Sequence, residues 1–204
     1  MTTTFLLVRH GQTEWNRIER FRGRYDVELN TTGMEQARRT AQRIVRHWKP
    51  TGIYSSPLRR AIQTAETIAQ VCNQKVEINL GLIDIDYGEW QGLTPTEAKE
   101  NWAEQISNWY KHPERSVIPG GETLTKVQER AITYITAVAK RHSGQTIVIV
   151  SHTVVNRLIL LRVLGLGIER FWHLRQEPCA INIIEMEDQD FTLCSMNDTC
   201  HLEE

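Results

Sequence analysis

A short apolar run near the start of the chain ends in three residues that could do chemistry together. Residues 5–8 are apolar and predict a short buried strand, and Arg9, His10 and Gly11 follow directly. A neutral imidazole can attack phosphorus, a guanidinium fits phosphate oxygens, and a glycine lets a ligand approach the backbone closely. These are the groups that attack on a phosphate ester requires, although an ordinary polar loop after a strand would look the same.

Two further predicted strands end in residues of the same kinds. Residues 146–151 form an apolar run followed by His152, and a short strand at residues 53–56 is soon followed by Arg59 and Arg60. In parallel α/β sheets, ligands bind at the carboxyl ends of the strands. If these strands are neighbours, two histidines and two arginines meet in one cleft, which core packing explains poorly.

The elements that would position these residues alternate along the chain. Apolar periodicity predicts helices at residues 33–48 and 153–164, and a long helix that ends at about His142. Another helix is expected to begin at Pro57 with Ser56 as its N-cap, and a further one to begin after the cap Thr94. Further strands are expected near residues 76–80, 180–186 and 191–197, with an irregular stretch at 81–92. This alternation predicts a three-layer α/β/α fold with a mostly parallel central sheet.

Bulk properties limit the function classes. The chain has 204 residues, 40% hydrophobic and 24% charged, and a formal net charge of −1, so a single domain over residues 1–204 is expected. Nothing in the charge favours nucleic acid or a membrane as a partner. The four cysteines show no disulfide or metal spacing, and no leader or membrane segment is recognised, which favours reduced thiols and a cytoplasmic location.

A basic, aromatic-containing segment lies at residues 17–25. Its members are Arg17, Arg20, Arg22 and Arg24, with Phe21 and Tyr25 among them. Such a segment can bind nucleic acid, but the neutral overall charge favours an electropositive rim that attracts phosphorylated anions.

Phosphoryl transfer also needs a carboxylic acid to protonate the leaving oxygen and later to activate water. No HExxH or DxDx(T/V) pattern is present, so neither a metal nor another cofactor is expected, and the arginines would replace magnesium.

Taken together, these motifs resemble the histidine phosphatase superfamily, in its phosphoglycerate mutase-like branch. The similar segments are residues 9–16, 22–29, 55–65 and 151–153, in the family's order. The resemblance implies a phosphoglycerate mutase-like fold, a phosphohistidine on His10, and oxygen binding by Arg9, Arg60 and His152. It also implies that residues 22–29 close over the substrate.

The acid is less certain from the sequence. Residues 82–92 resemble the family's acid segment, in which a glutamate usually stands at the position of Asp84. An aspartate is one methylene shorter but can do the same proton chemistry. Asp86 and Glu89 remain alternatives.

The chain is most similar to the family's small phosphatases, of the α-ribazole phosphatase or metal-independent phosphoserine phosphatase type. Compared with the mutases, the stretch at residues 92–120 is short and the C-terminus ends early. We therefore expect a metal-independent phosphomonoesterase that acts on a small phosphorylated metabolite, with a homodimer possible. The alternatives are a cofactor-dependent phosphoglycerate mutase and a non-catalytic phospho-ligand-binding module. Expected substrate-binding residues are Thr13, Asn16, Arg22, Gly23, Thr153 and His201.

Overall fold

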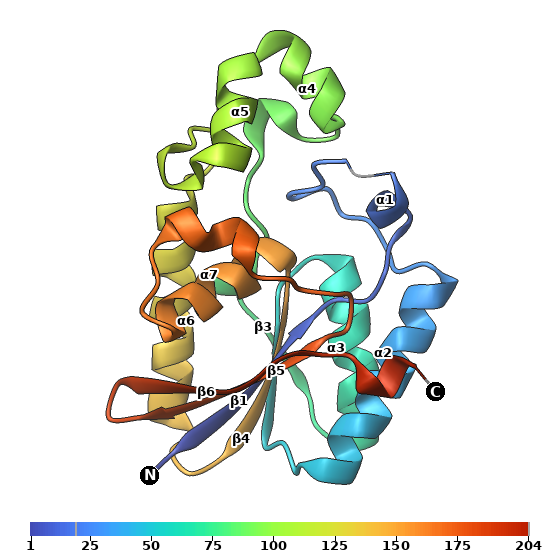
Figure 1. Ribbon diagram of the computed structural model, residues 1–204. Helices are drawn as coiled ribbons and strands as arrows, with labels where there is room; N and C mark the ends of the chain where they lie inside the picture. Colours follow the sequence, from blue (N-terminus) through green and yellow to red (C-terminus); the bar gives the residue numbers. More distant parts are fainter. Residues whose placement is uncertain (19, 204) are drawn as a thin grey trace.

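The computed structural model describes residues 1–18 and 20–203, and a six-stranded sheet forms its centre (Figure 1). The strands are β1 (Thr3–Arg9), β2 (Gly52–Ser55), β3 (Val76–Ile78), β4 (Thr146–Ser151), β5 (Ile181–Glu187) and β6 (Asp190–Asp198), in the order β3-β2-β4-β1-β5-β6. The pairs β1–β4, β2–β4 and β2–β3 are parallel, whereas β5 runs antiparallel to β1 and β6. The predicted mostly parallel sheet is confirmed.

Helices cover both faces of this sheet. In Figure 1, α2 (Thr31–His47) and α3 (Arg59–Cys72) lie on one side, and α6 (Leu124–Arg141) and α7 (Thr153–Val163) lie on the other. The helices α4 (Pro95–Asn101) and α5 (Ala103–Lys111) extend beyond the sheet at the top of the view. Short elements complete the chain: α1 (Glu14–Arg17), η1 (Leu80–Leu82), η2 (Gly88–Trp90), η3 (Pro113–Arg115), η4 (Ile168–His173) and η5 (Cys200–Leu202).

The alternation of side chains along the strands divides the core between the two faces. On β1, Phe5 and Leu7 pack toward α6 and α7, whereas Leu6 and Val8 pack toward α2 and α3. All four are at most 1% exposed. Because both faces are covered, the strand reads as a continuous apolar run, and the polar residues that follow it mark the edge of the sheet.

One expected element boundary differs in the structure. The start of the second helix at Pro57, with Ser56 as N-cap, is wrong: α3 begins at Arg59 after Leu58. The Asp26 carboxylate, from a distant loop, instead accepts the backbone N–H of Arg59 at 2.7 Å. Thr94 caps α4 as expected, in a reciprocal capping box with Glu97.

The helical stretch after Thr94 is divided. The backbone leaves the helical conformation at Trp102, and α5 begins with the next residue. The Trp102 side chain, at the break between the two helices, packs against the core on the α6–α7 face. In the described part of the chain, none of the helices has the length and apolar character needed to cross a membrane.

Candidate active site

His10 lies directly after β1 and is 1% exposed. Its Nδ1 is 2.7 Å from the backbone carbonyl of Gly11. A carbonyl can only accept, so Nδ1 carries the proton and Nε2 keeps the lone pair. Burial, followed by the positive charges of Arg60 and Arg9, holds the pKa of His10 well below 6.5. The imidazole is therefore a neutral potential nucleophile at pH 7.

The turn that carries His10 is held by hydrogen bonds to α2 and α3. The backbone N–H of Gly11 donates to the Thr64 hydroxyl of α3 at 3.1 Å, and that of Gln12 donates to the Gln36 side chain of α2 at 2.9 Å. A Cβ on Gly33 would lie 2.1 Å from the Gln12 carbonyl oxygen, so α2 can approach this closely only with glycine there. The position of His10 thus depends on both helices of this face.

Two arginines supply fixed positive charge next to His10. Arg60 is fully buried, and its Nη1 and Nη2 donate to the carbonyl oxygens of Tyr25 and Gly23, each at 2.8 Å. Arg9 donates to the Gln176 carbonyl at 2.5 Å. Burial and then the neighbouring Arg22 lower the pKa of Arg9 to about 9, which leaves it charged at neutral pH.

The second histidine lies beside the first. The rings of His10 and His152 have centroids 5.2 Å apart. His152 Nε2 lies 2.7 Å from the Ser56 hydroxyl, which explains why Ser56 does not cap α3. Burial and then Arg60 hold the pKa of His152 well below 6.5, so it is neutral in the free protein. A bound anion beside His152 would raise its pKa again and favour the protonated ring.

Asp84 is the carboxyl group that the structure brings to these side chains. Its Oδ2 is 3.0 Å from Arg60 Nη2 and 3.6 Å from His152 Nδ1. Burial raises the pKa of Asp84, partly opposed by Arg60 and Arg22. A carboxyl group with a raised pKa can hold a proton and give it up, as a general acid must.

The two alternative acids lie elsewhere in the described structure. Asp86 pairs with Arg24 at 3.1 Å and accepts the backbone N–H of Gly88. Glu89 reaches toward Gly120 on the far side of this loop. Among the described residues that line the cleft, neither Asp86 nor Glu89 is present, whereas Asp84 and Tyr87 are.

A cleft of about 430 Å³ opens next to this cluster. Of the expected residues, Arg9, Asn16, Arg22, Asp84 and Thr153 line it. His10, Arg60 and His152 are each at most 1% exposed and lie behind that lining. The cluster is therefore in a closed arrangement, in which Arg60 is bonded to the segment that carries Gly23.

Thr13 and Gly23, two of the expected substrate-binding residues, do not line the cleft. Thr13 is fully buried, and its N–H and hydroxyl both donate to the Asn16 side-chain oxygen, so it positions Asn16. Gly23, with φ at +49°, presents its carbonyl to Arg60 rather than to the cleft. Thr153 lines the cleft, and its buried hydroxyl has no hydrogen-bond partner among the described residues.

His201 does not line the cleft, contrary to the substrate contact expected from the sequence. Its Nε2 is 2.9 Å from the Thr40 hydroxyl of α2, and its side chain lines a different cavity. The antiparallel hairpin β5–β6 returns the chain to the sheet edge at which β1 ends, and η5 then packs against α2 instead of lining the cleft.

Several residues that line the cleft were not predicted from the sequence. Arg157 donates to the Leu174 carbonyl at 2.7 Å and lies over the ring of Trp172, 4.9 Å from its centroid. It is one helical turn after Thr153, a spacing that could have indicated it. Other lining residues that were not expected are Tyr87, Tyr110, Arg175, Gln176 and Glu177, whereas Arg20 of the expected electropositive rim and Trp109 also line the cleft. In the described residues, no group of three or more metal-ligating side chains is found.

Comparisons with known proteins agree with this geometry. Residues 5–199 match the family model described as histidine phosphatase superfamily (branch 1). Phosphoserine phosphatase 1 of Hydrogenobacter thermophilus is 37% identical over 199 residues, covering 98% of this chain and 94% of that protein.

Solved structures are similar over the same length. Bacillus stearothermophilus YhfR superposes with a TM-score of 0.94 at 27% identity, covering 98% of this chain and 99% of the other. A phosphoserine phosphatase mutant from Entamoeba histolytica, in complex with phosphoserine, gives a TM-score of 0.84 at 29% identity, covering 98% and 99%.

Proposed function

Because the chain belongs to the histidine phosphatase superfamily (branch 1), we propose that it hydrolyses small phosphomonoesters through a phosphohistidine on His10. The observation that supports this proposal is the protonation state and surroundings of His10. Its Nδ1 proton is fixed by the Gly11 carbonyl, its pKa is lowered, and Arg60 and His152 lie beside it. A neutral imidazole flanked by cationic and N–H donors suits nucleophilic attack on phosphorus.

In the first step, His10 Nε2 attacks the phosphorus atom in line with the ester oxygen. The P–N bond forms as the P–O bond to the leaving group breaks, and Asp84 gives its proton to that oxygen. Arg9, Arg60 and His152 stabilise the charge on the other phosphate oxygens. Asn16, held by Thr13, donates a further hydrogen bond from the cleft wall.

In the second step, Asp84 takes a proton from a water molecule, which attacks the phosphorus atom of the phosphohistidine. The P–N bond breaks, inorganic phosphate leaves, and neutral His10 and protonated Asp84 are restored. For the phosphate group to reach His10, the segment around Gly23 must move away from Arg60. We infer that this movement accompanies substrate binding.

We propose phosphoserine as the substrate to test first. Besides a phosphate, it has a carboxylate and an ammonium group, which need a cation and an acceptor respectively. Arg20, Arg157 and Arg175 line the cleft together with the Glu177 carboxylate. Proteins named phosphoserine phosphatase are among its similar relatives, which supports the same choice.

The test measures phosphate release from phosphoserine, 3-phosphoglycerate, α-ribazole phosphate and a sugar phosphate in the presence of EDTA. We expect one ester to be hydrolysed with unchanged rate when the chelator is present. His10→Ala should remove turnover while the circular-dichroism spectrum stays the same. Turnover that persists in His10→Ala would contradict the proposal.

A second assay tests the alternatives. Interconversion of phosphoglycerates, primed by 2,3-bisphosphoglycerate and with little phosphate release, would identify a mutase. Phosphate binding without any turnover would identify a binding module. A cytoplasmic location, a homodimer, and the lack of nucleic-acid and membrane partners stay predictions, for which fractionation, light scattering and binding assays are the measurements.

A further inference from the structure

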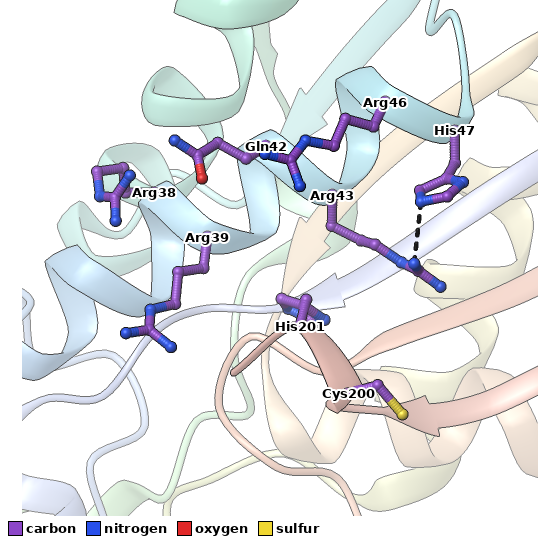
Figure 2. Close-up of a pocket in the computed structure, with 8 residues that line it drawn as sticks. All are labelled: Arg38, Arg39, Gln42, Arg43, Arg46, His47, Cys200 and His201. Atoms are coloured by element: carbon purple, nitrogen blue, oxygen red, sulfur yellow. Dashed lines mark hydrogen bonds between the residues drawn. The ribbon is translucent and has the colours of Figure 1, made fainter. Parts of the chain in front are cut away.

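A second cavity, of about 270 Å³, lies between α2 and the C-terminal segment (Figure 2). It shares none of its lining with the catalytic cleft. Four arginines and two histidines contribute to it: Arg38, Arg39, Arg43, Arg46, His47 and His201. No carboxylate is in its lining, as far as the described residues show. We refer to it as the α2 groove.

The arginines of the α2 groove repel one another and so lower the stability of α2. Arg39, Arg43 and Arg46 follow one another at spacings of four and three residues, so they occupy one side of the helix, as Figure 2 shows. Like charges at these spacings destabilise a helix. Cations near the C-terminus of α2 also offset its dipole, but this favours Arg46 and His47 only, because the effect is confined to the last turn.

Nearby carboxylates balance part of this charge. Glu35 pairs with Arg38 at 2.7 Å and with Arg39 at 3.0 Å, from the turn before the groove. Asp198 lies 3.8 Å from Arg43, at the outer limit of an ion pair. Arg46 has no ion pair among the residues that the structure describes. The groove therefore keeps an excess of positive charge.

Two buried nitrogen atoms along the groove also lack a hydrogen-bond partner in the described structure, and the one on Arg43 is a donor. The one on His201 is an acceptor, because the Thr40 hydroxyl donates to the Gln36 carbonyl and so accepts from Nε2. His201 is 9% exposed and is fixed through Nε2 by the Thr40 hydroxyl, yet its Nδ1 has no hydrogen-bond partner in the described structure. Arg43 Nε is likewise buried without a partner, while its Nη1 contacts the His47 ring at 2.9 Å. Buried polar groups without partners are uncommon and indicate a missing ligand or water.

We propose that the α2 groove binds a small anion with two linked phosphate groups, separately from the catalytic cleft. Guanidinium groups bind phosphate oxygens in pairs, and several of them can hold two adjacent phosphates where a single phosphate would leave some unpaired. The volume of about 270 Å³ is sufficient for a compact diphosphate. The buried Nε of Arg43 would donate at the inner wall.

The test is calorimetric titration of the intact protein with inorganic pyrophosphate at fixed ionic strength. We expect two sites, of which orthophosphate at saturating concentration blocks the one in the catalytic cleft. In the double variant Arg43→Gln/Arg46→Gln, the remaining site should weaken about tenfold to a hundredfold, because two charge-assisted contacts are lost. Turnover and competitive inhibition by orthophosphate should stay unchanged, since neither residue contacts the cleft.

Arg115→Gln is the matched control. Arg115 is 75% exposed, pairs with Glu114, and lies outside both cavities. Weakening of the same size in this variant would show general attraction by net charge and would overturn the proposal. A single pyrophosphate site that orthophosphate fully displaces would overturn it as well. So would binding of a single-stranded oligonucleotide in preference to pyrophosphate.

Discussion

Arg60 and Asp84 form a buried ion pair, with Nη2 of the arginine 3.0 Å from Oδ2 of the aspartate. Arg60 is fully buried and Asp84 is 6% exposed, so solvent screens this pair little. The arginine opposes the rise in the pKa of Asp84 that burial causes. A bound phosphate dianion would compete for the same guanidinium, so we expect Asp84 to become more basic when substrate binds. The pair thus links phosphate binding to protonation of the acid.

The first prediction concerns the leaving group. Asp84→Asn cannot donate a proton, so hydrolysis of an alkyl phosphate should fall by about 10²–10⁴-fold. Hydrolysis of p-nitrophenyl phosphate should fall much less, because nitrophenolate leaves without protonation. Steady-state kcat/KM on both substrates is the measurement, because it reports formation of the phosphohistidine alone, whereas the later attack by water needs Asp84 whichever ester is used.

Asp86→Asn is the control for this prediction, because Asp86 is on the same loop but pairs with Arg24. Asp86→Asn should change the rate of hydrolysis of neither substrate. Equal slowing of both substrates in Asp84→Asn would mean that Asp84 is not the proton donor.

The second prediction concerns the geometry of Arg60. Arg60→Lys keeps the charge but loses the fork that reaches Gly23, Tyr25 and Asp84. We expect kcat/KM to fall by at least about a hundredfold, since one ammonium cannot replace paired donors. Its neighbour Arg59 is 60% exposed and pairs with Glu28, so Arg59→Lys should stay close to wild type. Similar losses in both variants would point to the stability of α3 rather than to phosphate binding.

The third prediction is the direction of the pH dependence. His10 must be neutral to attack, and its pKa lies well below 6.5, so activity should persist below pH 6.5 and fall only as pH drops through that lowered pKa. Asp84 must be protonated, and its pKa is raised above 3.8, so activity should fall as pH rises through that raised pKa. The profile of kcat/KM measures both limbs.

Asp84→Asn identifies the alkaline limb. With an alkyl phosphate as substrate, this limb should disappear from the residual activity of the variant while the acid limb remains. An alkaline limb that is unchanged would assign it to another group.

The fourth prediction concerns the close approach of α2 to the catalytic turn. In Gly33→Ala, the added Cβ would lie 2.1 Å from the Gln12 carbonyl oxygen, so the backbone must shift. We expect the free energy of unfolding to fall by about 2–4 kcal/mol and kcat to fall with it, because Gln12 is two residues from His10. Thr32→Ala, at an exposed neighbouring position, should change unfolding by less than about 0.5 kcal/mol. Chemical denaturation and kcat measure the two effects.

Local patterns in the sequence were sufficient for much of the fold. The apolar runs of β1 and β4 predicted buried strands, and the strand ends predicted that His10 and His152 would meet. Thr94 and Glu97 predicted a helix start, because a capping box depends only on residues three apart. These features follow from periodicity and short-range hydrogen bonding, which neighbouring residues determine.

Other features were decided by contacts between segments far apart in the chain. The Ser56 hydroxyl contacts His152 rather than capping α3, and Asp26 supplies the acceptor at the start of that helix. The C-terminal hairpin carries His201 to Thr40 and away from the cleft. None of these contacts has a local signal, since each polar group had several possible partners until the chain folded.

The sequence by itself therefore determined which residue types stand at the ends of the strands. Only the tertiary structure decided which carboxyl group lies beside these residues. Asp84, Asp86 and Glu89 are equivalent as residue types on one irregular stretch, but only Asp84 is buried against Arg60 and His152. Burial and neighbouring charge set the pKa of an acid, and both are properties of the folded chain.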